Sequence, residues 1–124
     1  MKRTLLPAAL IATLAAATLA ADPEPAAQAT LDRLIGAVQK NDLPTLLQHA
    51  SPQMKEGLTQ QLLDSVSKDL SPHLQKGYTA TYLGDLHQRG VRVLLWKLTF
   101  KDGRDDALVR VAMQGEDVAG FFIQ

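Results

Sequence analysis

The sequence contains no cysteine among its 124 residues. This absence excludes a disulfide framework, a thiolate metal site, a cysteine nucleophile and a lipid anchor on an N-terminal cysteine. Aromatic residues make up only 5% of the chain, with a single tryptophan, and the formal net charge is zero. A chain without a basic surplus has no electrostatic footprint for nucleic acid or for an anionic membrane surface. The fold must therefore be stabilised by its apolar core alone.

The N-terminus combines the three features of a cleavable secretory signal peptide. Lys2 and Arg3 supply the positive charge, residues 5–19 form an apolar stretch, and small side chains allow cleavage after Ala20 or Ala21. An uncleaved membrane anchor is the alternative, but the apolar run is short and mostly alanine, which inserts weakly into membranes. We therefore predict a periplasmic or secreted product with no membrane attachment after cleavage.

The chain is predicted to divide into a signal peptide at 1–21, a proline-rich spacer at 22–25 and one domain at 26–124. That domain is large enough to fold around a single core without disulfides or metals. Cleavage removes two of the 13 basic residues and none of the 13 acidic ones. The mature chain is therefore slightly acidic.

Apolar residues at helical spacing predict one long helix at 26–40, a short one at 43–50 and a second long one at 52–69. Each of the last two begins at an Asp or Ser followed closely by proline, which is a typical helix start. On the third helix a stripe with a spacing of four is expected to face the core: Met54, Leu58, Leu62, Val66 and Leu70. Ser71-Pro72 repeats the start signal and predicts a separate single turn.

From Tyr78 the apolar period changes to two, which predicts strands at 78–86, 91–100, 107–114 and 118–123. Asp102-Gly103 is a strong signal for a two-residue type I′ hairpin turn. This turn would place three apolar pairs opposite each other: Leu98 with Ala107, Trp96 with Val109, and Leu94 with Val111. A following turn at Gly115-Glu116 would place Met113 opposite Val118 and Val109 opposite Phe122.

The other face of this predicted sheet is also largely apolar, although Lys97 and Arg110 interrupt it. Helices can cover only one face of a sheet in a chain of this size. Exposed apolar patches of several hundred Å² usually mark contact sites. We therefore expect this face to be buried in a homodimer or by a long loop.

Several short motifs resemble a known family. They are Lys40-Asn41-Asp42, the stretch from Ser51 to Lys55, Leu58 to Leu62, Phe100 to Gly103, and Gly120 to Ile123. In this pattern the chain is similar to the NTF2-like or cystatin-like superfamily, and to its DUF3887-type branch of small exported bacterial proteins. The resemblance implies an α+β fold in which one long, one short and one long helix pack on a curved four-stranded antiparallel sheet shaped like a cone. In such relatives the sheet and the long helix leave a cone-shaped pocket, which some families use for binding or catalysis and others fill, and the DUF3887-type branch has no established activity.

Candidate catalytic residues are few. Ser65 and Lys68 match the spacing of acyl-serine enzymes, but no companion motif follows and both lie near the polar side of a helix. His49, His73 and His87 lack the spacing of a helical metal pair, so we predict no metal site and no cofactor. Asp85 is the one carboxylate that merits testing as a proton-transfer group.

Four aromatic residues are the candidate ligand-binding set, because they could line a cavity between the sheet and the helices: Tyr78, Tyr82, Trp96 and Phe122. The alternative is that they simply fill the core, where a buried Trp or Tyr needs only one hydrogen-bond partner. The sequence therefore favours a non-enzymatic module that binds a small apolar ligand or a protein partner and that dimerises through its sheet. A small hydrolase or isomerase acting in the cone pocket, and a structural protein with a filled core, are the alternatives.

Overall fold

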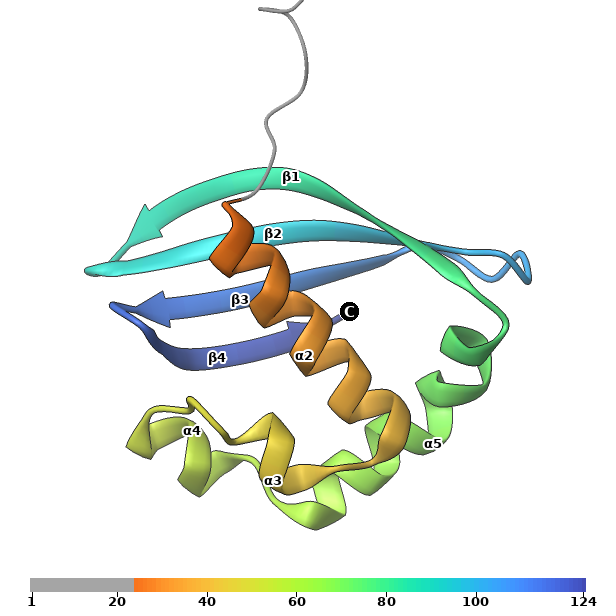
Figure 1. The fold of residues 1–124 in the computed structure, drawn as a ribbon, viewed down its shortest axis with the longest axis horizontal. Coiled ribbons are helices and arrows are strands. Elements are labelled where there is room, and N and C mark those ends of the chain that lie inside the picture. Colours follow the sequence, from red (N-terminus) through yellow and green to blue (C-terminus); the bar gives the residue numbers. More distant parts are fainter. Residues whose placement is uncertain (1–23) are drawn as a thin grey trace, which may run out of the picture.

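The computed structural model describes residues 24–124, so the predicted signal peptide at 1–21 and the cleavage site lie outside the described residues. Four helices precede four strands: α2 (Pro25–Lys40), α3 (Leu43–Leu46), α4 (Pro52–Gly57), α5 (Gln60–Gln75), β1 (Tyr78–Gln88), β2 (Val91–Phe100), β3 (Ala107–Gln114) and β4 (Asp117–Ile123). The strands form one open antiparallel sheet in the order β1-β2-β3-β4. α2 crosses one face of this sheet, and α3, α4 and α5 lie beyond its β4 side (Figure 1). The α+β class predicted from the sequence is confirmed.

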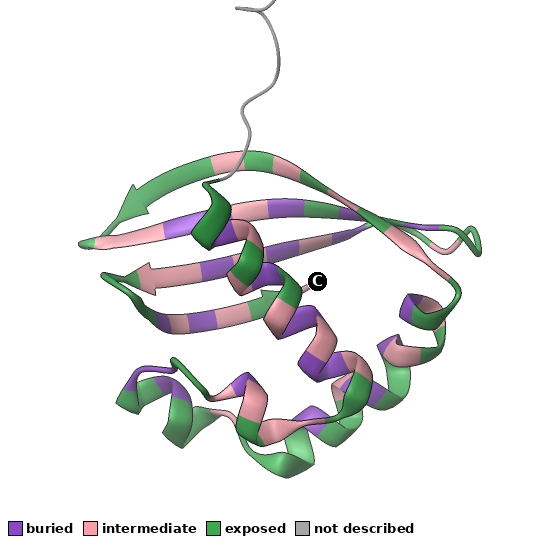
Figure 2. Cartoon of the chain, viewed as in Figure 1, coloured by how far each residue is buried: buried purple, intermediate pink, exposed green. Residues whose placement is uncertain are grey.

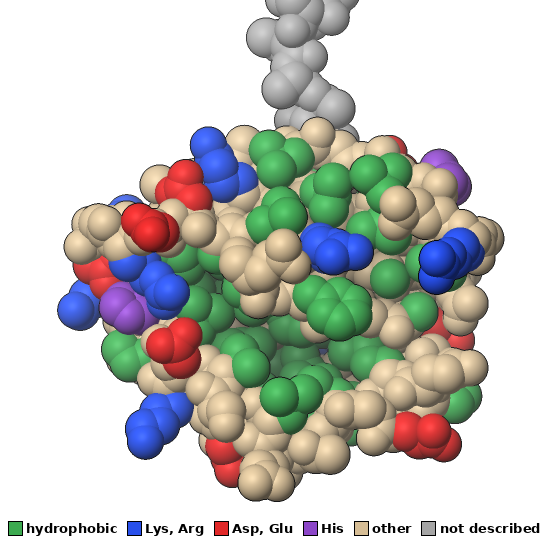
Figure 3. All heavy atoms as spheres, turned by 180° about the vertical axis from the view of Figure 1, so that it is seen from behind, with side chains coloured by type: hydrophobic (Ala, Val, Ile, Leu, Met, Phe, Trp, Pro, Cys, Tyr) green, Lys and Arg blue, Asp and Glu red, His purple; other side chains and the backbone are tan. Residues whose placement is uncertain are grey.

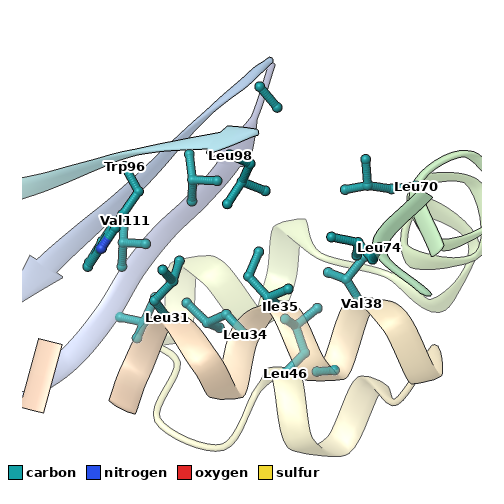
Figure 4. Packing of buried hydrophobic residues seen from close by; sticks show 14 of the residues in the cluster. Leu31, Leu34, Ile35, Val38, Leu46, Leu70, Leu74, Trp96, Leu98 and Val111 are labelled. Atoms are coloured by element: carbon teal, nitrogen blue, oxygen red, sulfur yellow. The ribbon is translucent and has the colours of Figure 1, made fainter. Parts of the chain in front are cut away.

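The core lies between α2 and the sheet. The apolar stripe on α2 is buried, with Leu31, Leu34, Ile35 and Val38 exposed by no more than 1%. These side chains point toward the strands, where Trp96, Leu98 and Val111 face them (Figure 4). The alternation of buried and less buried residues along β2 and β3 shows which face of the sheet meets the helix (Figure 2). We call this the inner face.

α2 ends where the sequence predicts, but the next helix is shorter than expected. Asn41 adopts a left-handed conformation with φ 54° and closes α2, and the Asp42 side chain accepts a hydrogen bond from the Thr45 N–H. α3 ends at Leu46 instead of continuing to Ala50. The chain leaves the helix because Ala50 forms a parallel bridge with Val118 at the start of β4.

The predicted helix at 52–69 is wrong, because it is two helices. Leu58 is extended, and the Thr59 side chain accepts a hydrogen bond from the Leu62 N–H, so that a new helix begins at Gln60. The break resets the phase of the apolar stripe. Leu63 is therefore buried with 1% exposure, whereas Leu62, predicted to face the core, is 46% exposed.

Ser71-Pro72 does not start a separate turn, since α5 runs through both residues to Gln75. The Ser71 hydroxyl donates to the Gln39 carbonyl at 2.8 Å and so ties α5 to α2 instead of capping a new helix. Pro72 lacks an N–H for the Lys68 carbonyl, but Lys68 is exposed and water can replace that bond. The helix order is thus long, short, short, long.

The four strands lie where they were predicted, and the β2–β3 register is the predicted one. The connection between them is wider than a two-residue turn, because Lys101 N–H bonds to the Gly77 carbonyl and only Gly103 of the predicted turn pair has a positive φ, +85°. The predicted β3–β4 register is right where Met113 faces Val118 but wrong on the other side of the bulge. A bulge between Ala112 and Met113 pairs Phe122 with Arg110 instead of Val109.

Candidate functional site

A cleft of about 560 Å³ opens between the N-terminal half of α2 and the inner face of the sheet. Small side chains on one side of α2 leave this space, at Ala26, Ala29 and Thr30. Farther along α2, the larger side chains of Leu34, Ile35 and Val38 are buried in the core. The apolar lining from the sheet comes from Leu94 and Met113, and the remaining lining residues are Glu24, Ala27, Arg33, His49, Arg92, Gly115 and Glu116.

Arg92 lines the cleft and forms ion pairs with two acidic groups. Its Nε donates to Asp85 Oδ2 at 2.6 Å, and its other guanidinium nitrogen lies 2.6 Å from Glu24 Oε1. The hydrogen bond to Asp85 and then that to Glu24 raise the pKa of Arg92, and the same guanidinium lowers the pKa of Asp85. Arg92 therefore ties β1 and β2 to the start of α2.

Arg33 is the second guanidinium in the cleft and differs from the first. Its side chain is half-buried, and its Nε is buried with no hydrogen-bond partner among the described residues. It forms no ion pair within residues 24–124. His49 and Glu116 also line the cleft, and both are exposed. The cleft thus presents one cation that no described protein group neutralises.

The four predicted aromatic residues are not brought together. Tyr82 packs against Trp96 on the inner face, with ring centroids 5.3 Å apart, and Trp96 is completely buried. Tyr78 shares that face and is half-buried, and burial, with the charge of Asp32, raises its pKa. Phe122 lies on the opposite face, 55% exposed and beneath the Arg110 guanidinium, because the bulge shifts the register by one residue.

Tyr78, Tyr82 and Trp96 are not among the residues that line the cleft. Trp96 nevertheless resembles Arg33 in one respect: its indole N–H is buried without an acceptor in residues 24–124. It stands two residues beyond Leu94, on the same face of β2. The inner face therefore holds a second unsatisfied donor close to the cleft in sequence.

The other candidate residues lie elsewhere. His73 Nδ1 is 2.5 Å from Asp102 Oδ2, a contact that joins α5 to the β2–β3 connection and lowers the pKa of Asp102. His87 is exposed near the end of β1. Ser65 and Lys68 are exposed on α5, and the Ser65 hydroxyl donates to the Gln61 carbonyl. Of the three histidines, only His49 lines the cleft.

Two findings cover the described part of the chain as a whole. Residues 24–124 contain no cluster of three or more His, Asp or Glu side chains placed to bind a metal ion. Within the same range no helix has the length and hydropathy needed to cross a membrane.

Comparison with known proteins adds no assignment. No protein-family model matches the chain, and no curated protein matches it in sequence. The NTF2-like resemblance therefore stays a prediction beside the observed α+β fold.

Arg33 is not among the candidate residues predicted from the sequence. A signal does exist. Residues 26, 29, 30 and 33 follow the three- and four-residue spacing of one helical face, and the first three are small. Such a face next to a core stripe indicates space beside the helix with a cation at its end.

The outer face of the sheet is the second candidate surface. Hydrophobic side chains gather there, interrupted by isolated basic groups (Figure 3). Val93 is already buried, with 7% exposure, whereas Leu83 and Phe122 are 54% and 55% exposed. Lys97 and Arg110 supply positive charge on this face. The homodimer predicted through this face stays a prediction.

Proposed function

We propose that this chain is an exported, non-enzymatic binding module that holds a small organic anion in the cleft between α2 and the inner face of the sheet. The observation that carries the proposal is Arg33, a half-buried guanidinium with a buried and unpartnered Nε. Leaving a buried donor unpaired costs about 1–3 kcal/mol. A bound acceptor removes that cost, and a charged acceptor forms a stronger bond than a neutral one.

The ligand needs an apolar part as well as a negative charge. Leu94 and Met113 form an apolar lining opposite the small side chains of α2. The volume of about 560 Å³ falls in the range of small-molecule sites in proteins. A carboxylate, sulfonate or phosphate on an aliphatic or aromatic body therefore fits this cleft best, in keeping with the cone-shaped pocket that the family resemblance implies.

The hydrolase or isomerase alternative needs a proton-transfer group in the cleft. Asp85 is engaged by Arg92, and His73 and His87 are not among the lining residues. His49 and Glu116 do line the cleft, but no hydrogen bond orients either side chain toward a reacting position within residues 24–124. Binding is therefore the function that we propose.

The test uses 8-anilinonaphthalene-1-sulfonate, an apolar anion whose fluorescence rises when it leaves water. Titration of the mature protein should show saturable binding, and Arg33→Gln should weaken it about tenfold or more, the equivalent of one charge-assisted hydrogen bond. Arg110→Gln is the matched control, because it removes the same charge from the outer face of the sheet.

Equal affinity for the wild type and Arg33→Gln would contradict the proposal, and so would equal losses in the two variants. Native mass spectrometry of the protein recovered from its own periplasm gives a second measurement. We expect a chain that begins after Ala20 or Ala21 and carries a retained anion of low mass.

A further inference from the structure

β4 has a free edge along most of its length. It is the last strand of the sheet and pairs only with β3. On its other side only the start of the strand is covered. Val118 N–H donates to the His49 carbonyl at 2.7 Å, and Ser51 N–H donates to the Val118 carbonyl at 2.8 Å. Beyond Val118, no backbone hydrogen bond from the described residues covers this edge.

The uncovered backbone groups can be assigned to particular residues. Leu108 and Gln124 exchange both of their backbone hydrogen bonds, at 2.8 and 3.0 Å. The direction of the backbone N–H and C=O groups alternates along an antiparallel strand. The backbone groups of Phe122 therefore point toward β3, whereas those of Phe121 and Ile123 point toward the free edge. Phe121 and Ile123 thus present unpaired backbone groups at alternate positions along the edge.

An apolar groove of about 260 Å³ lies directly beside this edge. Phe121 and Ile123 line it from β4, and Leu58, Leu62 and Val66 line it from the side of α5. Its other lining residues are Val38, Leu46, Leu63, Phe122 and Gln124, so Gln124 is the sole polar side chain in the lining. On the molecular surface a hollow with hydrophobic walls opens below the apolar face of the sheet (Figure 3).

Edge strands are normally protected from pairing by charged residues, proline or bulges. Here the bulge opposite Ala112 and Met113 protects only the beginning of β4. The rest of the strand, Gly120 to Ile123, has no charge and no proline. Across the groove, the side chain of Leu62 is 46% exposed and available for contact.

We propose that the β4 edge and the apolar groove bind an extended apolar peptide, which adds to the sheet as a further strand. Main-chain hydrogen bonds to Phe121 and Ile123 would supply the affinity, and alternate side chains would enter the groove. The chain itself provides the precedent, since Ala50 already pairs with β4 at Val118 on this same edge. A peptide would continue that pairing along the uncovered part. This site is separate from the cleft that contains Arg33.

A peptide can both fill the groove and pair with the free backbone groups of the edge, which an aliphatic ligand cannot do. A fatty chain fills an apolar groove but offers no donors or acceptors to Phe121 and Ile123. A second copy of the protein, paired through its own β4, is the other occupant with the right chemistry. The two are separated by the assembly state of the free chain.

The test uses a soluble peptide of about seven residues, an ordinary strand length, that alternates valine and threonine between terminal lysines. Binding to the mature protein is followed by amide hydrogen exchange, which reports the protection of individual N–H groups. We expect the peptide to slow exchange at Phe121 and Ile123. Two N-methylated peptides block the two alternating sets of amides. The peptide whose β4-facing amides are methylated should not bind, and the other should bind like the unmodified peptide.

Leu62→Lys should weaken peptide binding about tenfold or more, because it places a charge in the apolar groove. Ser65→Lys is the control, since it adds the same charge at an exposed position of α5 that does not line the groove. Arg33→Gln should leave peptide binding unchanged, so this proposal and the anion site fail separately. Folding of each variant is checked by circular dichroism.

Three results would overturn the proposal. One is that the unmodified peptide fails to bind at concentrations up to about 1 mM. Another is equal binding of both N-methylated forms, which would show that the groove takes any apolar chain. The third is a free protein that sediments as a dimer and becomes monomeric with Leu62→Lys, which would assign the edge to a second copy.

Discussion

Replacement of Leu63 by alanine should cost far more folding free energy than replacement of its neighbour Leu62. The two leucines lie side by side in the first turn of α5, but Leu63 is 1% exposed and Leu62 is 46% exposed. The difference follows from the helix break at Leu58 and Thr59. The pair of variants therefore tests the break directly.

The magnitudes can be worked out from burial. A fully buried leucine cut back to alanine loses its transfer free energy and leaves a cavity, for a total of about 3–5 kcal/mol. Leu62 already has about half of its side chain in water, so its truncation should cost about 1 kcal/mol. In a domain of this size each kcal/mol lowers Tm by about 4–8 °C, so Leu63→Ala should lower Tm by at least 12 °C or so.

Urea unfolding followed by tryptophan fluorescence measures both variants. Trp96 is the one tryptophan and is completely buried, so its emission reports loss of the core without interference. The slope of unfolding free energy against urea should stay that of the wild type, because neither change alters the surface exposed on unfolding by much. The midpoints then give the difference in stability.

The opposite order would refute this reasoning. A single uninterrupted helix over residues 52–69 would place Leu62 on the buried stripe with Leu58 and Val66. In that arrangement Leu62→Ala would cost as much as Leu63→Ala or more. Equal costs would show that α5 does not begin where Thr59 caps it.

Three further predictions concern the cap, an ion pair and the sheet. Thr59→Ala should reduce stability by about 1 kcal/mol in urea unfolding, the usual cost of an N-cap, whereas an unchanged midpoint would exclude a capping role. The pKa of Asp102 is lowered, chiefly by His73, so its contribution is present above the ordinary carboxyl pKa of 3.8 and is lost as the pH falls below that value. The Tm difference between the wild type and Asp102→Asn should accordingly shrink as the pH falls from about 5 to about 2, and a constant difference would contradict the assignment. Sedimentation velocity should show a homodimer that Leu83→Lys dissociates, and a monomeric wild type at high concentration would exclude pairing through the outer face.

The strands could be predicted from the sequence because their signals are local. Alternating apolar residues and the pairing of Trp96 with Val109 fix the β2–β3 register, and that register survives although the connecting turn is not the two-residue type. A shift of one residue would turn every apolar side chain to the other face of the sheet, so the apolar pattern resists such a shift. An error in the predicted turn can therefore leave the pairing intact. The stripe on α2 is equally local.

The failures arose where contacts between distant segments decide the structure. Ser71-Pro72 has the local pattern of a helix start, but the bond from Ser71 to Gln39 on α2 serves a different purpose. The bulge in β3–β4 likewise lies where residues 49–51 pair with β4, and no local pattern marks that contact. Phe122 therefore lies on the outer face instead of the predicted inner face. The cleft was also out of reach, because the gap beside α2 exists only once the sheet faces it.

The pairing of Ala50 with Val118 also has a kinetic consequence. It joins the middle of the chain to its last strand, so the helical half has no partner at this edge until β4 has been synthesised. Contacts between residues distant in sequence slow folding, since the intervening chain must be ordered first. During synthesis α3 and α5 can already pack on α2, but residues 49–51 and α4 lack their partner on this side until β4 emerges. We expect a chain that stops before β4 to leave residues 49–51 unpaired, and this edge to form last when the full sheet folds.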